Sequence, residues 1–148
     1  MKICIIGCGY VGLVSSVCLA ELGNKVYCVD KNKKKINMLN NGLIPIYEPG
    51  LEEILKKNCK DKRLIFTVDL KKAVINSDIL FICVGTPVYK KSDLANLSYV
   101  FKVARDIRKY IKKYKIIITK STVPVTTCDK IEEIINLKVK KKFFDVVS

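Results

Sequence analysis

Three glycines near the amino terminus have the spacing of a turn that binds the phosphates of a dinucleotide. They lie in Gly7-Cys-Gly-Tyr-Val-Gly12, which follows an apolar, β-branched run and opens a stretch of small and apolar residues. In such a turn the first glycine permits the tight bend, the second lets a pyrophosphate approach the backbone, and the third lets the next helix pack closely. The free N–H groups and positive dipole end of that helix attract the phosphates. Cys8 and Val11 fall inside the turn, so we expect them within reach of the pyrophosphate.

An acidic residue stands where a carboxylate that binds ribose is expected. Asp30 ends the second apolar run, about 18 residues after Gly12. A carboxylate accepts hydrogen bonds from both ribose hydroxyls and repels a 2′-phosphate, so Asp30 favours NAD over NADP. Four of the five residues from 31 to 35 are lysines, and a lysine there could hold such a phosphate, although most are expected at solvated helix positions. The alternative is an ordinary glycine turn beside an aspartate that binds no ligand.

Two later loops carry hydroxyl groups directly after apolar runs. One is Val84-Gly-Thr-Pro-Val88 and the other is Lys120-Ser-Thr-Val-Pro-Val125. Ligands of doubly wound sheets bind outside the carboxyl ends of the strands, so Thr86, Ser121 and Thr122 are candidate partners for cofactor, substrate or water. These hydroxyls could equally satisfy the backbone of their own turns.

The elements that must position these motifs alternate between strand and helix from end to end. We predict strands at residues 2–6, 25–30, 64–68, 79–84, 115–119 and 143–147, and helices at 10–22, 33–41, 51–59, 70–76, 96–114 and 127–136. The strand at 79–84 is apolar on both faces and is expected to be central. Asp69 is expected to cap the helix at 70–76. The predicted fold is therefore α/β, a Rossmann-type doubly wound parallel β-sheet with helices on both faces.

The composition is that of one globular domain with a strong positive charge. The 148 residues are 49% hydrophobic, and 28 Lys+Arg stand against 14 Asp+Glu. The basic residues are lysines except for Arg63, Arg105 and Arg108, which indicates a compositional bias rather than a patch that binds nucleic acid. The positive surface could still attract an anionic nucleotide over a distance.

The cysteines and the amino-terminal residues exclude several classes of protein. The chain has seven cysteines, no histidine and no CxxC pair, which argues against a zinc or other metal site. The odd number of cysteines and the lack of a secretion signal favour reduced thiols in the cytoplasm. Residues 2–20 are apolar but interrupted by glycines, so we expect neither a signal peptide nor a membrane span.

Five segments together closely resemble the UDP-glucose/GDP-mannose dehydrogenase family, and they occur in the order of that family. They span essentially the whole chain, and their combination is specific although each piece alone is not. The segment with the sequence IPIYEPGL is most similar to UDP-glucose dehydrogenases. The segments are Gly7-Cys-Gly-Tyr-Val-Gly-Leu13, Ile44-Pro-Ile-Tyr-Glu-Pro-Gly-Leu51, Val84-Gly-Thr-Pro87, Ala95-Asn-Leu-Ser-Tyr-Val100 and Lys120-Ser-Thr-Val-Pro-Val125.

The resemblance implies an NAD-dependent, two-step oxidation of the C6 hydroxyl of UDP-glucose to UDP-glucuronate, carried out by a homo-oligomer that binds neither nucleic acid nor membrane. The alternatives are a GDP-mannose or UDP-N-acetylhexosamine substrate, or a stand-alone NAD-binding regulatory module. In the family, the threonine that matches Thr122 also helps to hold a catalytic water. The residues implied to line the NAD site are Gly7, Cys8, Gly9, Tyr10, Val11, Gly12, Asp30, Lys35, Val84, Gly85, Thr86, Pro87, Val88, Ser121, Thr122 and Val123.

This chain also departs from the pattern of the family. Asn96 stands where many members have Asp, Thr126 where many have Gly, and the loop at residues 86–95 lacks a common glycine. The family's PEFLREG-like segment, substrate-binding residues and nucleophilic cysteine are expected downstream of Ser148. We therefore expect residues 1–148 to form the NAD-binding domain, without the substrate-binding and C-terminal domains, and to be inactive alone.

Overall fold

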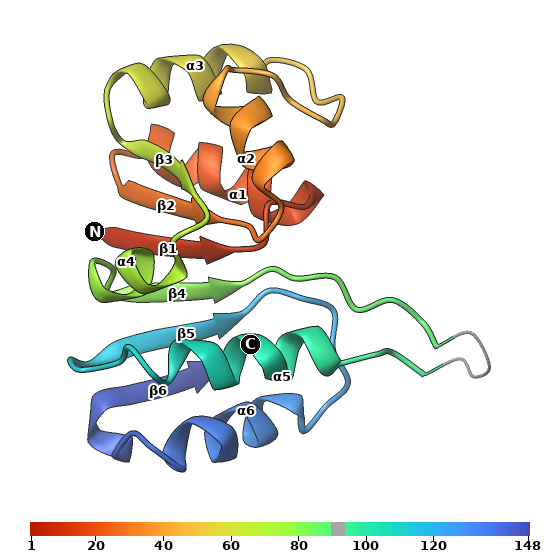
Figure 1. Cartoon of the computed structure of the whole chain (residues 1–148), viewed down its shortest axis with the longest axis vertical. Helices are drawn as coiled ribbons and strands as arrows, with labels where there is room; N and C mark the ends of the chain where they lie inside the picture. The colour runs from red at the N-terminus through yellow and green to blue at the C-terminus, as the bar shows by residue number, and fades with distance from the viewer. Residues whose placement is uncertain (90–93) are drawn as a thin grey trace.

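A six-stranded parallel sheet organises the computed structural model, which describes residues 1–89 and 94–148 (Figure 1). Its order is β3-β2-β1-β4-β5-β6, and all five strand pairings are parallel. The strands are β1 (Lys2–Ile6), β2 (Lys25–Val29), β3 (Leu64–Thr67), β4 (Ile79–Ile82), β5 (Lys115–Thr119) and β6 (Phe144–Val147). The helices are α1 (Tyr10–Glu21), α2 (Lys33–Asn40), α3 (Leu51–Lys60), α4 (Leu70–Ile75), α5 (Ser98–Ile107) and α6 (Thr127–Asn136), with a 3-10 turn η1 (Lys141–Phe143) before β6. The predicted fold class is confirmed.

The order of the strands creates a crevice at one edge of the sheet. From the central β1 the chain adds β2 and β3 on one side, then crosses to β4 on the other side and continues to β5 and β6. The loops that follow β1 and β4 therefore leave in opposite directions at the carboxyl ends of these strands. Ligands of doubly wound sheets bind at this switch point.

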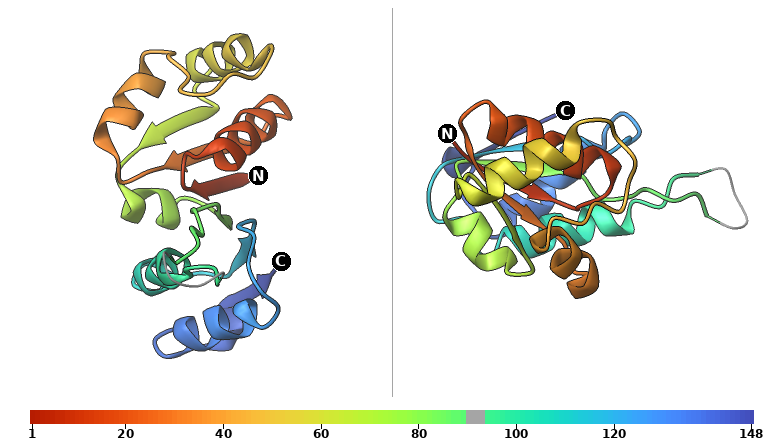
Figure 2. Two further views of the ribbon diagram at one scale, coloured as in Figure 1. Left: turned by 90° about the vertical axis from the view of Figure 1, so that its right-hand side faces the viewer. Right: turned by 90° about the horizontal axis from the view of Figure 1, so that it is seen from above.

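The helices divide into two layers that follow the two directions of winding (Figure 2). Helices α1, α2 and α3 pack through Leu13, Val17, Leu39 and Leu55 on the side of β1–β3 that carries Ile5. Helices α4, α5 and α6 pack on the opposite side of the sheet. Helix α4 reaches as far as β1 and β2, so these two strands have helices on both of their faces.

The strands β4–β6 are less completely covered. In β5, Ile117 is fully buried on the side of α5 and α6, whereas Ile116 and Ile118 on the other side are only half-buried. The same alternation occurs in β4, where Ile79 and Phe81 are half-buried. Among the described residues, helices thus pack on one face of β5 and β6 (Figure 2). The strand predicted at 79–84 does lie inside the sheet, as β4, but one of its two apolar faces is only partly covered.

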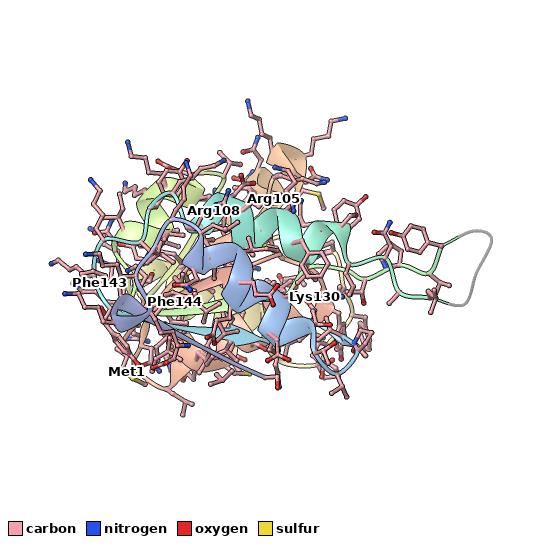
Figure 3. All side chains as sticks on the ribbon, turned by 90° about the horizontal axis from the view of Figure 1, so that it is seen from below. Met1, Arg105, Arg108, Lys130, Phe143 and Phe144 are labelled. Atoms are coloured by element: carbon pink, nitrogen blue, oxygen red, sulfur yellow. The ribbon has the colours of Figure 1, made fainter. Side chains whose placement is uncertain are left out.

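Most of the expected element boundaries differ from the observed ones by one or two residues, and the largest error is in the helix at 96–114. Helix α5 spans only Ser98–Ile107, because residues 108–110 tighten into turns in which the amide of Tyr110 bonds the carbonyl of Ile107. Arg108, the C-cap residue of α5 labelled in Figure 3, donates to the carbonyl of Ile134 in the neighbouring α6 at 2.7 Å. The predicted cap holds: the carboxylate of Asp69 accepts from the amide of Lys72 at 2.9 Å. No helix within the described residues is long and apolar enough to cross a membrane.

Candidate dinucleotide-binding site

The glycine turn between β1 and α1 is shaped by contacts that exclude side chains at two positions. Gly7 has a φ of +108°, and a Cβ there would lie 2.5 Å from the carbonyl oxygen of Cys83. A Cβ on Gly12 would lie 1.9 Å from the carbonyl oxygen of Gly7. These two glycines therefore let α1 and the turn pack directly on each other and on the end of β4.

The middle glycine of the turn, Gly9, faces open space. A Cβ on Gly9 would meet no atom within 4 Å. Gly9 is also the N-cap of α1, and its residue type offers no side chain to bond the first amides of the helix. Backbone N–H groups at such a helix start lack intrahelical partners and attract anions. The turn thus presents an uncapped helix end to an open space of the kind that a phosphate can fill.

Asp30 is held in a fixed position directly after β2. Its Oδ2 accepts from the amide of Cys8 at 3.0 Å and lies 3.5 Å from the Nζ of Lys35, and its Oδ1 accepts from the amide of Asn32 at 2.9 Å. Burial alone would raise the pKa of Asp30, but the two amide hydrogen bonds and the charge of Lys35 outweigh it and hold the pKa below its ordinary value. The carboxylate is therefore ionised at neutral pH and can only accept hydrogen bonds.

The glycine turn and Asp30 border a single cavity of about 520 Å³. This volume is within the range of ordinary small-molecule sites. The predicted site residues that line it are Gly7, Gly9, Asp30, Lys35, Val84 and Gly85. The remaining lining comes from residues at or next to the strand ends, from the start of α4 and from along α5, namely Ile6, Val29, Lys31, Asn32, Val68, Leu70, Cys83, Tyr99, Lys102, Val103 and Asp106.

Sequence reasoning missed the wall that α5 contributes. Tyr99 is exposed by 43%, and the Nζ of Lys31 lies 4.9 Å from the centre of its ring. The wall from Val68 could have been found, because Val68 directly follows β3 at the same edge of the sheet as Asp30. The part of the wall on α5 had no comparable signal, since a single helical tyrosine is as typical of a core or a surface.

The loops after β4 and β5 are tied together by hydroxyl groups. The Oγ of Ser121 lies 2.7 Å from the carbonyl oxygen of Val84 and 3.2 Å from that of Ile82. The Oγ1 of Thr86 donates to the carbonyl of Thr122 at 3.0 Å. The one proton of each hydroxyl is thus donated to the backbone of β4 or of the neighbouring loop, while its oxygen can still accept a hydrogen bond. Thr122 is exposed, and its backbone is fixed by Thr86.

The other predicted residues of these loops lie farther from the cavity. Val88 is 60% exposed and forms an antiparallel bridge with Ala95, in an arm that extends beyond the sheet (Figure 1). Pro87 belongs to the same arm, where its carbonyl accepts from the amide of Asn96 at 2.8 Å. Val123 is half-buried against the α5–α6 side of the core. None of these three residues is among those that line the cavity.

Three further predicted residues belong to the glycine turn and the start of α1. The thiol of Cys8 is 1% exposed and points into the core, so alkylation of Cys8 is not a workable probe of the cavity. Val11 is 47% exposed on the first turn of α1. The hydroxyl of Tyr10 donates to the carboxylate of Glu48, and this hydrogen bond raises the pKa of Tyr10. Tyr10 thus joins α1 to the IPIYEPGL segment.

Two departures from the family pattern have different structural consequences. The Oδ1 of Asn96 accepts from the amide of Ser98 at 3.0 Å, a role that an aspartate fills equally well. Thr126, by contrast, has a φ of +74°, in the left-handed region that favours glycine and strains a β-branched residue. The third departure, in the loop at 86–95, falls partly on residues 90–93, which lie outside the described residues.

Comparisons with known proteins show the family to which the chain belongs. The pattern of the UDP-glucose/GDP-mannose dehydrogenase family, NAD binding domain, matches residues 1–148. The UDP-glucose 6-dehydrogenase TuaD of Bacillus subtilis is 50% identical over 148 residues, which are 99% of this chain and 32% of that protein. The UDP-glucose 6-dehydrogenase of Rhizobium meliloti is 52% identical over 135 residues, which are 91% of this chain and 31% of that protein.

Solved structures give the same result for the fold. A ternary complex of GDP-mannose dehydrogenase from Pseudomonas aeruginosa matches with a TM-score of 0.93 and 38% identity, over 99% of this chain and 35% of that one. A UDP-glucose dehydrogenase from Pyrobaculum islandicum matches with a TM-score of 0.90 and 34% identity, over 97% of this chain and 34% of that one. The chain thus spans about a third of the length of these relatives.

Proposed function

The chain belongs to the UDP-glucose/GDP-mannose dehydrogenase family, as its NAD-binding domain, and we propose that it is the cofactor-binding part of a UDP-glucose 6-dehydrogenase. The choice of UDP-glucose is supported by the two relatives of 50% and 52% identity, whose names give that substrate. The downstream two-thirds of such a protein would bind the sugar nucleotide and complete the oxidation to UDP-glucuronate.

The observation that carries the proposal is the pairing of an anion site and a carboxylate on the wall of one cavity. The open backbone at Gly9 and the uncapped start of α1 would hold the pyrophosphate of NAD. Asp30 would accept hydrogen bonds from the hydroxyls of the adenosine ribose, and Lys35 would keep its carboxylate in place. A phosphate on the 2′-hydroxyl would approach the negative charge of Asp30, which favours NAD over NADP.

The loops after β4 and β5 would serve the half of the cofactor that reacts. NAD, when bound, supplies the hydride acceptor, and the residues of this chain orient it. Thr122 is the one candidate catalytic residue in this chain, and we propose that it holds a water near the reacting carbon. Ser121 and Thr86 are better described as positioning residues, because their hydroxyls bond the backbone of the two loops. The proposed cofactor contacts nearest the cavity are Gly7, Gly9, Asp30, Lys35, Val84 and Gly85, followed by Cys8, Tyr10, Val11, Gly12, Thr86, Pro87, Val88, Ser121, Thr122 and Val123.

The cofactor preference can be measured by calorimetry on the isolated chain. We expect NAD to bind and NADP to bind more weakly, because the ionised Asp30 stands at the proposed ribose site. Tighter binding of NADP than of NAD would contradict the assignment of Asp30. No binding of either nucleotide would contradict the proposal as a whole.

The isolated chain is expected to bind cofactor without completing the oxidation. The resemblance assigns the nucleophilic cysteine, the general base and the sugar-binding residues to polypeptide downstream of Ser148. Fixing both reactants in a site can supply about 7–11 kcal/mol of a barrier, and a chain that holds only one of them forgoes this contribution. Purified chain mixed with UDP-glucose and excess NAD should form no NADH by absorbance. Sustained formation of two NADH per sugar, in a preparation free of full-length enzyme, would show that the chain is sufficient.

A further inference from the structure

Two buried thiols lie in contact directly behind the glycine turn. The Sγ of Cys8, in the turn, is 3.0 Å from the Sγ of Cys28, in β2. Cys8 is 1% exposed and Cys28 is fully buried, and both are free thiols. The sulfur atoms of a disulfide are about 2.05 Å apart, so these two would need to approach by only about 1 Å to be bonded.

The backbone around Cys8 holds the two sulfurs in this position. The amide of Cys8 donates to Asp30 at 3.0 Å, and the amide of Gly7 donates to the carbonyl of Val29 at 2.7 Å. Two consecutive amides therefore fasten the turn to the end of β2 next to the thiol pair. Within the described residues, this is the one place where two cysteine sulfurs are in hydrogen-bond contact.

We propose that Cys8 and Cys28 are an oxidation site, at which a peroxide converts the two thiols to a disulfide that fastens the glycine turn to β2 and weakens NAD binding. One sulfur attacks an oxygen of the peroxide and becomes a sulfenic acid, with release of one water. The second sulfur then attacks the first, the S–S bond forms, and the second water leaves. Overall, two thiols and one hydrogen peroxide give one disulfide and two waters, and a small dithiol reverses the change.

The environment of the pair determines when the reaction takes place. The hydrogen bond with Cys28 and burial both raise the pKa of Cys8, so the thiolate that reacts with peroxide is scarce at neutral pH. Oxidation is therefore slow while the turn is closed and proceeds when the turn opens to solvent. NAD bound on the turn stabilises the closed form, so it slows the oxidation.

The effect on the cofactor rests on the proposed function. Formation of the disulfide would shorten the distance between the two sulfur atoms by about 1 Å and draw Cys8 toward β2. Gly9, next to Cys8, supplies the open backbone at which the pyrophosphate would bind. The amide of Cys8, which bonds Asp30, would move with the Cys8 sulfur. We expect the oxidised chain to bind NAD about tenfold more weakly than the reduced chain.

Mass spectrometry tests the site without reference to any ligand. The reduced, folded chain is treated with hydrogen peroxide, the remaining thiols are alkylated, and the product is digested with trypsin. The expected product joins the peptide of residues 3–25 to that of residues 26–31, with two hydrogens lost and with Cys8 as the linked residue on fragmentation. Cys8→Ala should abolish this link, whereas Cys18→Ala, at an exposed position of α1, should leave it intact.

The possible results separate the oxidation site from the proposed function. If Cys18 in the unaltered chain is oxidised and no link between Cys8 and Cys28 forms, the oxidation site is wrong. A link that forms equally fast with saturating NAD, or an oxidised chain with unchanged NAD affinity, contradicts the coupling to the cofactor. A reduced chain that binds no NAD contradicts the proposed function, while the mass of the linked peptide still decides whether the oxidation site exists.

Discussion

The two halves of the sheet differ in how completely they are built. Strands β1 and β2 have helices on both faces, and β2 ends at a carboxylate whose three partners are already in place. Strands β5 and β6 have helices on one face among the described residues, and the hydroxyls of Ser121 and Thr86 tie together the loops that follow β4 and β5. We propose that the first half is preorganised to hold the adenosine diphosphate part of NAD, whereas one face of β5 is only half-buried among the described residues of the second half.

In the proposed function, the adenosine half of the cofactor and the reacting half would be held by different parts of the protein. The cavity lies between the two halves, because Gly9 and Asp30 line it from one half and Val84 and Tyr99 line it from the other. The candidate catalytic side chain, Thr122, is exposed in the loop after β5 and does not line the cavity. The half-buried side of β4 and β5 matches the expectation that a parallel sheet needs cover on both faces to be complete. The contrast between the halves can be measured by comparing matched substitutions.

The largest expected effects come from isoleucines on the two faces of one strand. Ile5 and Ile6 of β1 are both buried, so Ile5→Ala and Ile6→Ala should each lower the free energy of unfolding by about 2–5 kcal/mol. In β5, Ile117→Ala should cost a similar amount, but Ile118→Ala only about 1 kcal/mol, because its side chain is already half-exposed. Urea denaturation measures all four. Equal losses at Ile117 and Ile118 would contradict the difference between the halves.

The glycine turn gives the next largest effect. Gly12→Ala places a Cβ 1.9 Å from the carbonyl oxygen of Gly7, so it should cost about 3 kcal/mol of stability through forced movement of α1. Gly9→Ala meets no atom within 4 Å and should change stability little, while it weakens NAD binding by filling the proposed phosphate site. Thermal unfolding and NAD titration of both variants test this. A stable Gly12→Ala variant would mean that α1 does not pack as described.

The smallest effect concerns two strained residues, one in each half. Thr126 has a φ of +74° and Lys62 a φ of +58°, and left-handed backbone costs an L-residue roughly 1–2 kcal/mol. Glycine removes this strain, but it also increases the conformational entropy of the unfolded chain, which offsets part of the stabilisation. Thr126→Gly should therefore raise the melting temperature by about 2 °C. Lys62→Gly should raise it less, because lysine is not β-branched. A lower melting temperature for Thr126→Gly would show that this backbone is not strained.

The sequence was sufficient for the fold because its local patterns agree with one another. The apolar runs, the glycines that end α1 and α2, and the cap at Asp69 each indicated the same alternation of strand and helix. The strand order could not be derived from these patterns alone, and the end of α5 was wrong by several residues. Its apolar spacing continues past Ile107 to the buried Ile111, although the backbone has left the helix.

The parts of the candidate site that depend on a backbone requirement for a particular residue type could be predicted from the sequence. The parts that depend on packing between distant elements could not. Gly7 and Gly12 are required by close contacts, and Asp30 is placed by the end of a strand. The wall formed by Tyr99 depends on how α5 lies against β4, and no local pattern encodes that arrangement. The contact between Cys8 and Cys28 is equally invisible, because it joins residues 20 positions apart through the packing of the turn on β2.

The central claim is that the cavity beside Asp30 binds NAD, and one calorimetric comparison tests it most directly. The unaltered chain, Asp30→Ala and Asp61→Ala are titrated with NAD after circular dichroism has shown that each is folded. Asp61 lies at the end of α3, is paired with Arg63 and does not line the cavity, so it is the matched control. We predict that Asp30→Ala weakens NAD binding by about tenfold or more, while Asp61→Ala leaves it unchanged. Equal affinity of the folded Asp30→Ala variant and the unaltered chain would contradict the account.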